Sequence, residues 1–135
     1  MATELVNPPS LARAIGFSHA VVGTGKMIAL AGQIGWDQSS KIVSEVFAAQ
    51  FDQALANLCV ALKEAGGATT DIMSLRIYVT DKHEYNAQLK DIGAAYRKHL
   101  GRHFPAMALV QVADLLEPGA KVEIEGLAAV GDKRS

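Results

Sequence analysis

The feature that most constrains the fold is a pair of amphipathic helical patterns set between short apolar strands. In the first pattern, apolar residues recur every three or four positions, and Gly66 and Gly67 end it. In the second pattern the same spacing ends at Gly101. The two apolar stripes are Phe47, Phe51, Leu55, Leu58, Leu62 and Ala65, and then Tyr85, Leu89, Ile92, Tyr96 and Leu100. Each stripe has to pack against another layer of the protein.

Five short apolar runs surround the two helical patterns, and they predict the order ββαβαββ. The runs cover residues 16–22, 26–34, 71–80, 104–112 and 121–130. Glycines at 23 and 25 predict a hairpin between the first two runs. Ser44 is expected to cap the first helix, and Asp81 with Glu84 resembles a capping box that opens the second. The pattern therefore predicts an α+β domain with a mixed sheet.

Two helices can cover only one side of a sheet this wide, so the other side must meet solvent or another subunit. Side chains alternate along strands, and the faces expected to stay uncovered mix apolar and polar residues. They carry Met107, Leu109, Gln111, Glu123, Glu125, Leu127 and Ala129. Such a mixture is typical of an oligomer interface that contains a polar cleft. We therefore expect this face to be buried between subunits, with small-molecule pockets at the seams.

Composition and length narrow the class of protein. The chain has 135 residues, which fits a single domain over 1–135, with 1–10 and 131–135 expected as flexible ends. A net charge of −1 argues against nucleic acid as a partner. No apolar run approaches the roughly 20 residues of a membrane span. One cysteine, Cys59, and four scattered histidines predict a cytoplasmic protein without disulfide, metal or cofactor.

Several segments, in order from Asn7 to Val130, resemble the Rid (YjgF) family of reactive-intermediate imine deaminases. The family patterns are S/A-G-Q-I, D-x-x-x-Q-x-x-x-x-L-x-N-L, D-I-V-x-x-x-V-F-L-x-D, F-P-A-R-S-x-V-x-V and V-E-I-E-A-I-A. The matching segments here are LAGQIG, SEVFAAQFDQALANL, DIMSLRIYVTD, FPAMALVQV and VEIEGLA. The resemblance implies a chorismate-mutase-like fold and a homotrimer with clefts between its subunits. It also implies hydrolysis of imines without a cofactor.

Three positions depart from the family pattern. In deaminating members F-P-A is followed by an arginine, whose planar guanidinium grips the substrate carboxylate. Met107 stands at this position and cannot pair with a carboxylate. The family's G-P-Y-S is replaced by Gly16-Phe17-Ser18-His19, one residue shorter, and Phe17 has no hydroxyl. The asparagine usual in the second helix aligns with Gly93. The resemblance thus implies a retained pocket without its carboxylate clamp.

Glu123 matches the family glutamate thought to orient water, and we take it as the candidate catalytic residue. That role requires partial desolvation and a raised pKa, and the alternative is an ordinary interface carboxylate. The backbone of Ala31 and Gly32 matches the family's substrate-binding segment. Met107 is either filler or the apolar floor of a pocket.

Each further candidate for substrate binding also has an ordinary structural interpretation. His19 is either a hydrogen-bonded structural histidine or a donor in the cleft. Arg102 and His103 either lie on a solvated loop or supply the positive charge that Met107 lacks. Phe17 stands at the family's aromatic position without its hydroxyl, and Trp36 is either a lid or ring-stacking wall over the cleft or a plug at an interface.

Three functions are compatible with these residues. The favoured one is a Rid-type hydrolase acting on an imine, enamine or related metabolite other than the usual small 2-imino acids. The second is a trimer that binds a metabolite without turnover. The third is an endoribonuclease, a label that some relatives carry, and the charge balance disfavours it.

Overall fold

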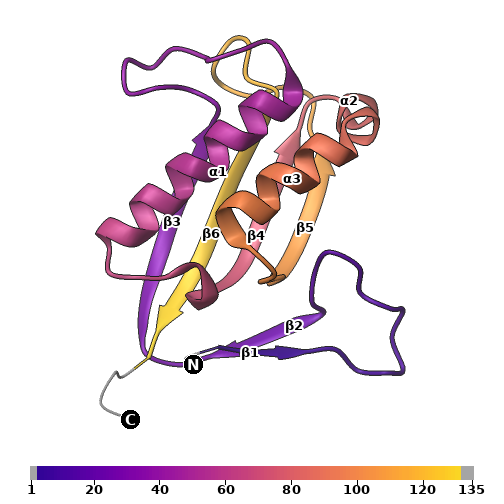
Figure 1. The fold of residues 1–135 in the computed structure, drawn as a ribbon, viewed down its shortest axis with the longest axis vertical. Helices are drawn as coiled ribbons and strands as arrows, with labels where there is room; N and C mark the ends of the chain where they lie inside the picture. The colour runs from indigo at the N-terminus through magenta and orange to yellow at the C-terminus, as the bar shows by residue number, and fades with distance from the viewer. Residues whose placement is uncertain (1–2, 132–135) are drawn as a thin grey trace.

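The computed structural model describes residues 3–131 and has the expected α+β architecture (Figure 1). Its main sheet has the strand order β3-β6-β4-β5, in which β4 and β5 are parallel and the other neighbours antiparallel. The elements are β1 (Thr3–Val6), β2 (Ala20–Gly23), β3 (Lys26–Ile34), α1 (Phe47–Glu64), η1 (Thr69–Asp71), β4 (Ile72–Val79), α2 (Lys82–Ala87), α3 (Leu89–Leu100), β5 (Ala106–Gln111) and β6 (Val122–Val130).

The helices α1 and α3 lie side by side on one face of this sheet, as the two stripes predicted (Figure 1). The hydrophobic core lies between the layers, where Phe47, Leu55 and Leu58 of α1 are fully buried. They pack with Leu75 and Ile77 of β4 in one cluster. The mixed sheet with helices on one face is therefore confirmed.

The predicted hairpin between residues 16–22 and 26–34 is wrong. The strand β2 pairs with β1 instead, with Leu5 opposite Val21. Residues 3–6 lie in the segment expected to be flexible, yet they form this strand. The strand β3 pairs instead with β6 from its first residue, where Lys26 is opposite Val130, after Gly25 with a φ of +113°. The end of the chain beyond residue 131 lies outside the described residues.

The second predicted helix is divided in two at Gln88, where φ is −119° and ψ is 24°. The Gln88 side chain accepts a hydrogen bond from the backbone N–H of Ala48 at 2.9 Å, near the start of α1. Asp81 caps α2 as expected, because Oδ1 accepts from the N–H groups of His83 and Glu84. The break lets α2 run in a different direction from α3, which lies beside α1 on the face of the sheet (Figure 1).

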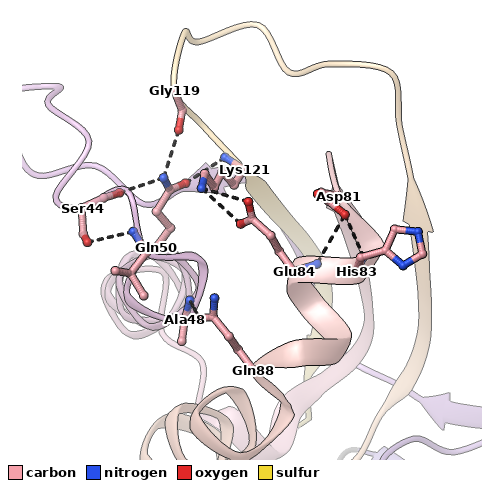
Figure 2. Close-up of polar contacts among 10 residues, drawn as sticks. Ser44, Ala48, Gln50, Asp81, His83, Glu84, Gln88, Gly119 and Lys121 are labelled. Carbon is pink, nitrogen blue, oxygen red and sulfur yellow. Dashed lines mark hydrogen bonds and ion pairs between the residues drawn. The ribbon is translucent and has the colours of Figure 1, made fainter.

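Ser44 does not cap α1, which begins at Phe47 after Val46. Figure 2 shows that Ser44 instead belongs to a polar network around Gln50, a fully buried residue of α1. The Gln50 Nε2 donates to the carbonyls of Ser44 at 2.8 Å and Gly119 at 3.0 Å. Its Oε1 accepts from the N–H of Lys121 at 2.8 Å. These bonds fix the start of β6 against α1.

The face of β5 that carries Met107 and Leu109 looks toward the helices. Leu75 is paired with Met107 and Ile77 with Leu109, and paired residues of neighbouring strands point to the same side. Because Leu75 and Ile77 are buried in the core, Met107 and Leu109 pack there as well. The expectation that these two residues lie on the uncovered face is therefore wrong. The uncovered face of β5 carries Val110 instead, which is 47% exposed.

The rest of the uncovered face agrees only in part with the sequence pattern. Glu123, Glu125 and Leu127 are half-buried residues of β6 that alternate with the core residues Ile124 and Ala128. Ala129 is fully buried. A Cβ placed at Gly23 would lie 2.9 Å from Met73 Sδ and 3.2 Å from Ala129 Cβ, so these groups lie against one another. Regular alternation with buried Leu75 would place Met73 on the face toward the helices. The register shift between Ile72 and Ser74 turns Met73 to the opposite face.

Candidate active site

A largely apolar cavity of about 230 Å³ lies between α3 and the edge strand β5. Met107, Ile77 and Phe104 line it from the strands and from the loop before β5. Leu89, Gly93 and Arg97 line it from α3, and they recur at intervals of four residues along one helix face. One face of α3 therefore forms this wall of the cavity, and the missing side chain at Gly93 leaves the space open.

Two of the three positions that depart from the family pattern, Gly93 and Met107, lie in this cavity, together with Gly16, which precedes the third, Phe17. Gly16, Gly93 and Met107 come from distant parts of the sequence, and all three line it. Phe17 is not among the lining residues, and its ring lies edge-to-face with His19 at a centroid distance of 5.3 Å. Met107 and Gly93, the positions where the family resemblance predicts an arginine and an asparagine, thus share one volume.

Ser18 places the segment with Gly16 beside the cavity. Ser18 is only 3% exposed, and its hydroxyl donates to the carbonyl of Phe104 at 2.6 Å. Its backbone N–H donates to the carbonyl of Pro105 at 3.0 Å. Sequence reasoning did not single out Ser18, although a hydroxyl residue followed by an apolar strand is a signal that could have drawn attention to it.

Two tyrosines contribute to the cavity wall. Burial raises the pKa of Tyr85 and, more strongly, that of Tyr96, so both phenols stay protonated at neutral pH. The Tyr96 hydroxyl donates to the carbonyl of His103 at 2.6 Å, which fixes the loop that leads to Met107. Tyr85 packs edge-to-face on Phe47 with centroids 6.0 Å apart. The wall is consequently rigid and uncharged except at Arg97.

Glu123 lies on the opposite face of the sheet, together with Gly32 and Ala31. A Cβ placed at Gly32 would lie 2.8 Å from Glu123 Cδ, so the carboxyl group rests directly over the glycine. Ala31 and Gly32 are exposed, and Glu123 is half-buried. The structure therefore brings together these three predicted residues, but it separates them from Met107. Within one chain the catalytic candidate and the cavity do not form one site.

Two residues beside Glu123 were missed by sequence reasoning. Tyr78 of β4 is paired with Glu123, and Arg76 is paired with Glu125. The Tyr78 hydroxyl donates a hydrogen bond to Glu125, which raises the pKa of Tyr78. The alternation of Arg76 and Tyr78 with buried Leu75, Ile77 and Val79 was the available signal. The uncovered face thus carries a compact polar cluster at its centre.

The two predicted histidines are engaged by backbone carbonyls away from the cavity. His19 Nε2 lies 2.6 Å from the carbonyl oxygen of Ala12, and the His19 N–H donates to Asn7 Oδ1 at 2.8 Å. His103 Nε2 lies 2.7 Å from the carbonyl oxygen of Ile72. Both rings hold loops to neighbouring segments.

Arg102 and Trp36 also lie outside the cavity. Arg102 is exposed and lines a separate hollow with Thr3 and Leu5. Trp36 lines another hollow between the loop after β3 and α1, and its carbonyl accepts from Asn57 Nδ2 at 2.9 Å. The structure therefore does not join either residue to Met107 or to Glu123.

Residues 3–131 contain neither a metal-binding cluster nor a membrane-spanning helix. In this range, no three His, Cys, Asp or Glu side chains gather closely enough to hold a metal ion. None of the described helices is long and apolar enough to cross a membrane.

The fold and the position of its cavity define an α+β protein of the Rid type, and comparison with known proteins agrees. The family described as Endoribonuclease L-PSP matches residues 9–130. Human 2-iminobutanoate/2-iminopropanoate deaminase is 36% identical over 120 residues, 87% of this chain and 83% of that protein. The chain belongs to this family, which is also known as Rid or YjgF.

Solved structures show the same fold. The Rid-family protein YyfB of Yersinia pestis, of unknown function, superposes with a TM-score of 0.86 at 31% identity, over 96% of this chain and all of that one (100%). RidA from an Antarctic Psychrobacter gives a TM-score of 0.67 at 29% identity, over 88% and 92% of the two chains.

Proposed function

We propose that the chain is a Rid-type hydrolase that deaminates an imine, enamine or related metabolite other than the usual small 2-imino acids. One observation carries this proposal. The cavity that holds Met107 at the arginine position is apolar, and it contains two of the three departing positions, Met107 and Gly93, whereas Glu123 and its glycine are retained. A retained catalytic candidate together with an altered cavity favours a change of substrate over a loss of reaction.

The reaction needs only water and a base. Glu123 would accept a proton from a water molecule as its oxygen attacks the imine carbon, and the nitrogen would gain a proton. The resulting carbinolamine loses ammonia and leaves a carbonyl product, so that one imine and one water give one carbonyl compound and one ammonia. Gly32 suits this role because a side chain there would displace the carboxylate.

The proposal includes a homotrimer in which the cavity of one subunit faces Glu123 of the next. The uncovered face supports it, because this face joins Leu127 to exposed apolar residues, Met27 at 56% and Val110 at 47%. An apolar sheet face with a central polar cluster suits a subunit interface better than open solvent. A trimer would also bring together the two halves that a single chain keeps apart.

We expect sedimentation of the wild type as a trimer at micromolar concentration, and dissociation of Leu127→Arg. The arginine would bury a charge at the interface, which costs several kcal/mol when it stays unpaired. Leu116→Arg is the control, because Leu116 is 100% exposed on the loop before β6. A wild-type monomer, or a trimeric Leu127→Arg variant, would contradict this assembly.

The reaction is tested with imines made in situ by amine or amino-acid oxidases. We expect the imines of leucine, phenylalanine or benzylamine to be hydrolysed faster than that of alanine, by roughly tenfold or more. Without an arginine at position 107, an imino acid loses a charge-assisted pair worth about 1.5–3 kcal/mol, and only a larger apolar group can compensate by packing in the cavity. Trapping the remaining imine with semicarbazide gives the rates. Equal or greater acceleration with alanine-derived imine would refute the altered substrate, and binding without turnover would favour the non-catalytic trimer.

A further inference from the structure

Arg97 is the cation at the rim of the Met107 cavity. It lies in the last turn of α3, it is exposed, and it lines the cavity. Its neighbours Lys98 and His99 both contact Asp52, at 3.1 Å and 2.7 Å. Arg97 makes no ion pair with any side chain in residues 3–131. No Asp or Glu side chain lines the cavity in the same range. The guanidinium is therefore available to an anion.

Gly93 leaves room for the Arg97 guanidinium, because it has no side chain. Residues four apart lie on the same helix face, and helical side chains lean toward the N-terminus, so Arg97 extends over position 93. A Cβ at Gly93 would lie 3.3 Å from Arg97 Nη1. Even one added carbon would thus meet the guanidinium closely. The glycine that replaces the family's asparagine leaves the space that Arg97 occupies.

We propose that Arg97 binds the carboxylate of a 2-imino acid whose large apolar side chain fills the cavity toward Met107. This inference rests on the proposed function and names its substrate class. In the deaminating relatives the arginine is supplied by the strand position of Met107, whereas here a guanidinium comes from the facing helix. The substrate carboxylate would consequently bind at the rim of the cavity, and the apolar side chain of the substrate would pack against its apolar floor.

The size of the cavity agrees with this class of substrate. At about 230 Å³ it exceeds an apolar cavity of roughly 150 Å³, which is enough to take up benzene. An isobutyl or phenyl group therefore fits, whereas the methyl group of the alanine-derived imine would leave most of the space empty. Apolar contact with Met107, Ile77 and Leu89 would favour the larger side chain.

Binding is tested with stable carbonyl compounds, so that the result does not depend on turnover. The probes are 4-methyl-2-oxopentanoate, pyruvate and the neutral 4-methylpentan-2-one, with dissociation constants from calorimetry. The wild type is expected to bind the branched keto acid most tightly. Arg97→Gln should weaken that binding by roughly tenfold or more, because a charge-assisted pair is lost, and leave binding of the ketone unchanged. Lys90→Gln removes the same charge from an exposed position of α3 outside the cavity and should bind as the wild type does.

Several binding results would overturn the inference. Among them are unchanged binding by Arg97→Gln, equal affinity of the wild type for keto acid and ketone, and no measurable binding of any keto acid. Loss of binding in Arg102→Gln instead would also overturn it and assign the carboxylate to the other hollow. Keto-acid binding that depends on Arg97, without imine turnover, would support the inference and refute the proposed function. Turnover of leucine-derived imine by Arg97→Gln at the wild-type rate would refute the inference and support the proposed function.

Gly93→Ala provides a second variant whose folding is not in doubt. Alanine is favoured over glycine inside a helix, so the melting temperature is expected to rise. The new methyl group would push the guanidinium aside and weaken keto-acid binding severalfold, with no change for the ketone. A more stable variant with unaltered affinity for the keto acid would contradict the role given to Gly93 and Arg97.

Discussion

Replacing Met107 by Arg is expected to destabilise the protein in buffer and to make its stability depend on small keto acids. Met107 packs against the core and lines an apolar cavity. A guanidinium there would find no acidic side chain among the described lining residues and would lie near Arg97. Burying an unpaired charge of this kind costs on the order of 2–4 kcal/mol. A bound carboxylate would offset about 2.7 kcal/mol at a concentration one hundred times its Kd.

Thermal melts of the wild type, Met107→Arg and Met107→Leu, with and without pyruvate, test this expectation. Met107→Leu is the matched control, since a swap of similar volume usually costs less than about 1.5 kcal/mol. Pyruvate should raise the melting temperature of Met107→Arg by more than that of the wild type or of Met107→Leu. If Met107→Arg melts like the wild type without any ligand, the packing of Met107 against the core does not contribute to stability. If it is destabilised but ignores pyruvate, the cavity does not bind carboxylates.

The order of elements from β2 onward could be predicted because it depends on local periodicity, whereas the strand β1 was missed. The stripe from Phe47 to Leu62 lies in α1 as expected, and it packs on strands whose alternation was equally regular. The interruption of the second helix was harder to predict. Gln88 divides the second helix because its amide caps α1, a contact between segments 40 residues apart in sequence. Local patterns carry no information about such distant partners.

The orientation of β5 shows where the sequence pattern is insufficient. Alternation correctly groups Met107 with Leu109, but it does not say which group faces the helices. The register with Leu75 and Ile77 decides this, and register is a non-local property. Both faces of β5 carry apolar residues, so hydrophobicity could not discriminate between them. The hairpin prediction was wrong for a related reason, because β3 takes its partner from the far end of the chain.

The candidate site could be predicted as single residues but not as an arrangement. The resemblance indicated Met107, Gly93 and the Gly16-Phe17 segment separately, and only the fold shows that Gly16, Gly93 and Met107 line one cavity. Arg97 was not considered, because on a helical wheel it is one of several exposed basic residues in the last turn of α3. Its position four residues after Gly93 becomes informative once the cavity is known.

Glu123→Gln is expected to lower kcat for the preferred imine by roughly 10²–10⁴-fold while the trimer and its melting temperature change little. General-base catalysis is worth about this much, and an amide cannot accept the proton of the attacking water. Glutamine has nearly the same shape, so it should still fit over Gly32, and the half-buried position leaves it access to solvent.

Glu125→Gln is the matched control on the same strand and the same face. It alters the hydrogen bond from Tyr78, and it leaves the carboxylate over Gly32 in place. Single-turnover rates of both variants, measured with the leucine-derived imine, should separate them by at least tenfold, with Glu123→Gln the slower. Keto-acid affinity should be similar in both, because both substitutions leave Arg97 and the apolar lining of the cavity unchanged. An unimpaired Glu123→Gln enzyme would show that Glu123 is an interface carboxylate, and a slower Glu125→Gln enzyme would transfer the base to the Tyr78–Glu125 pair.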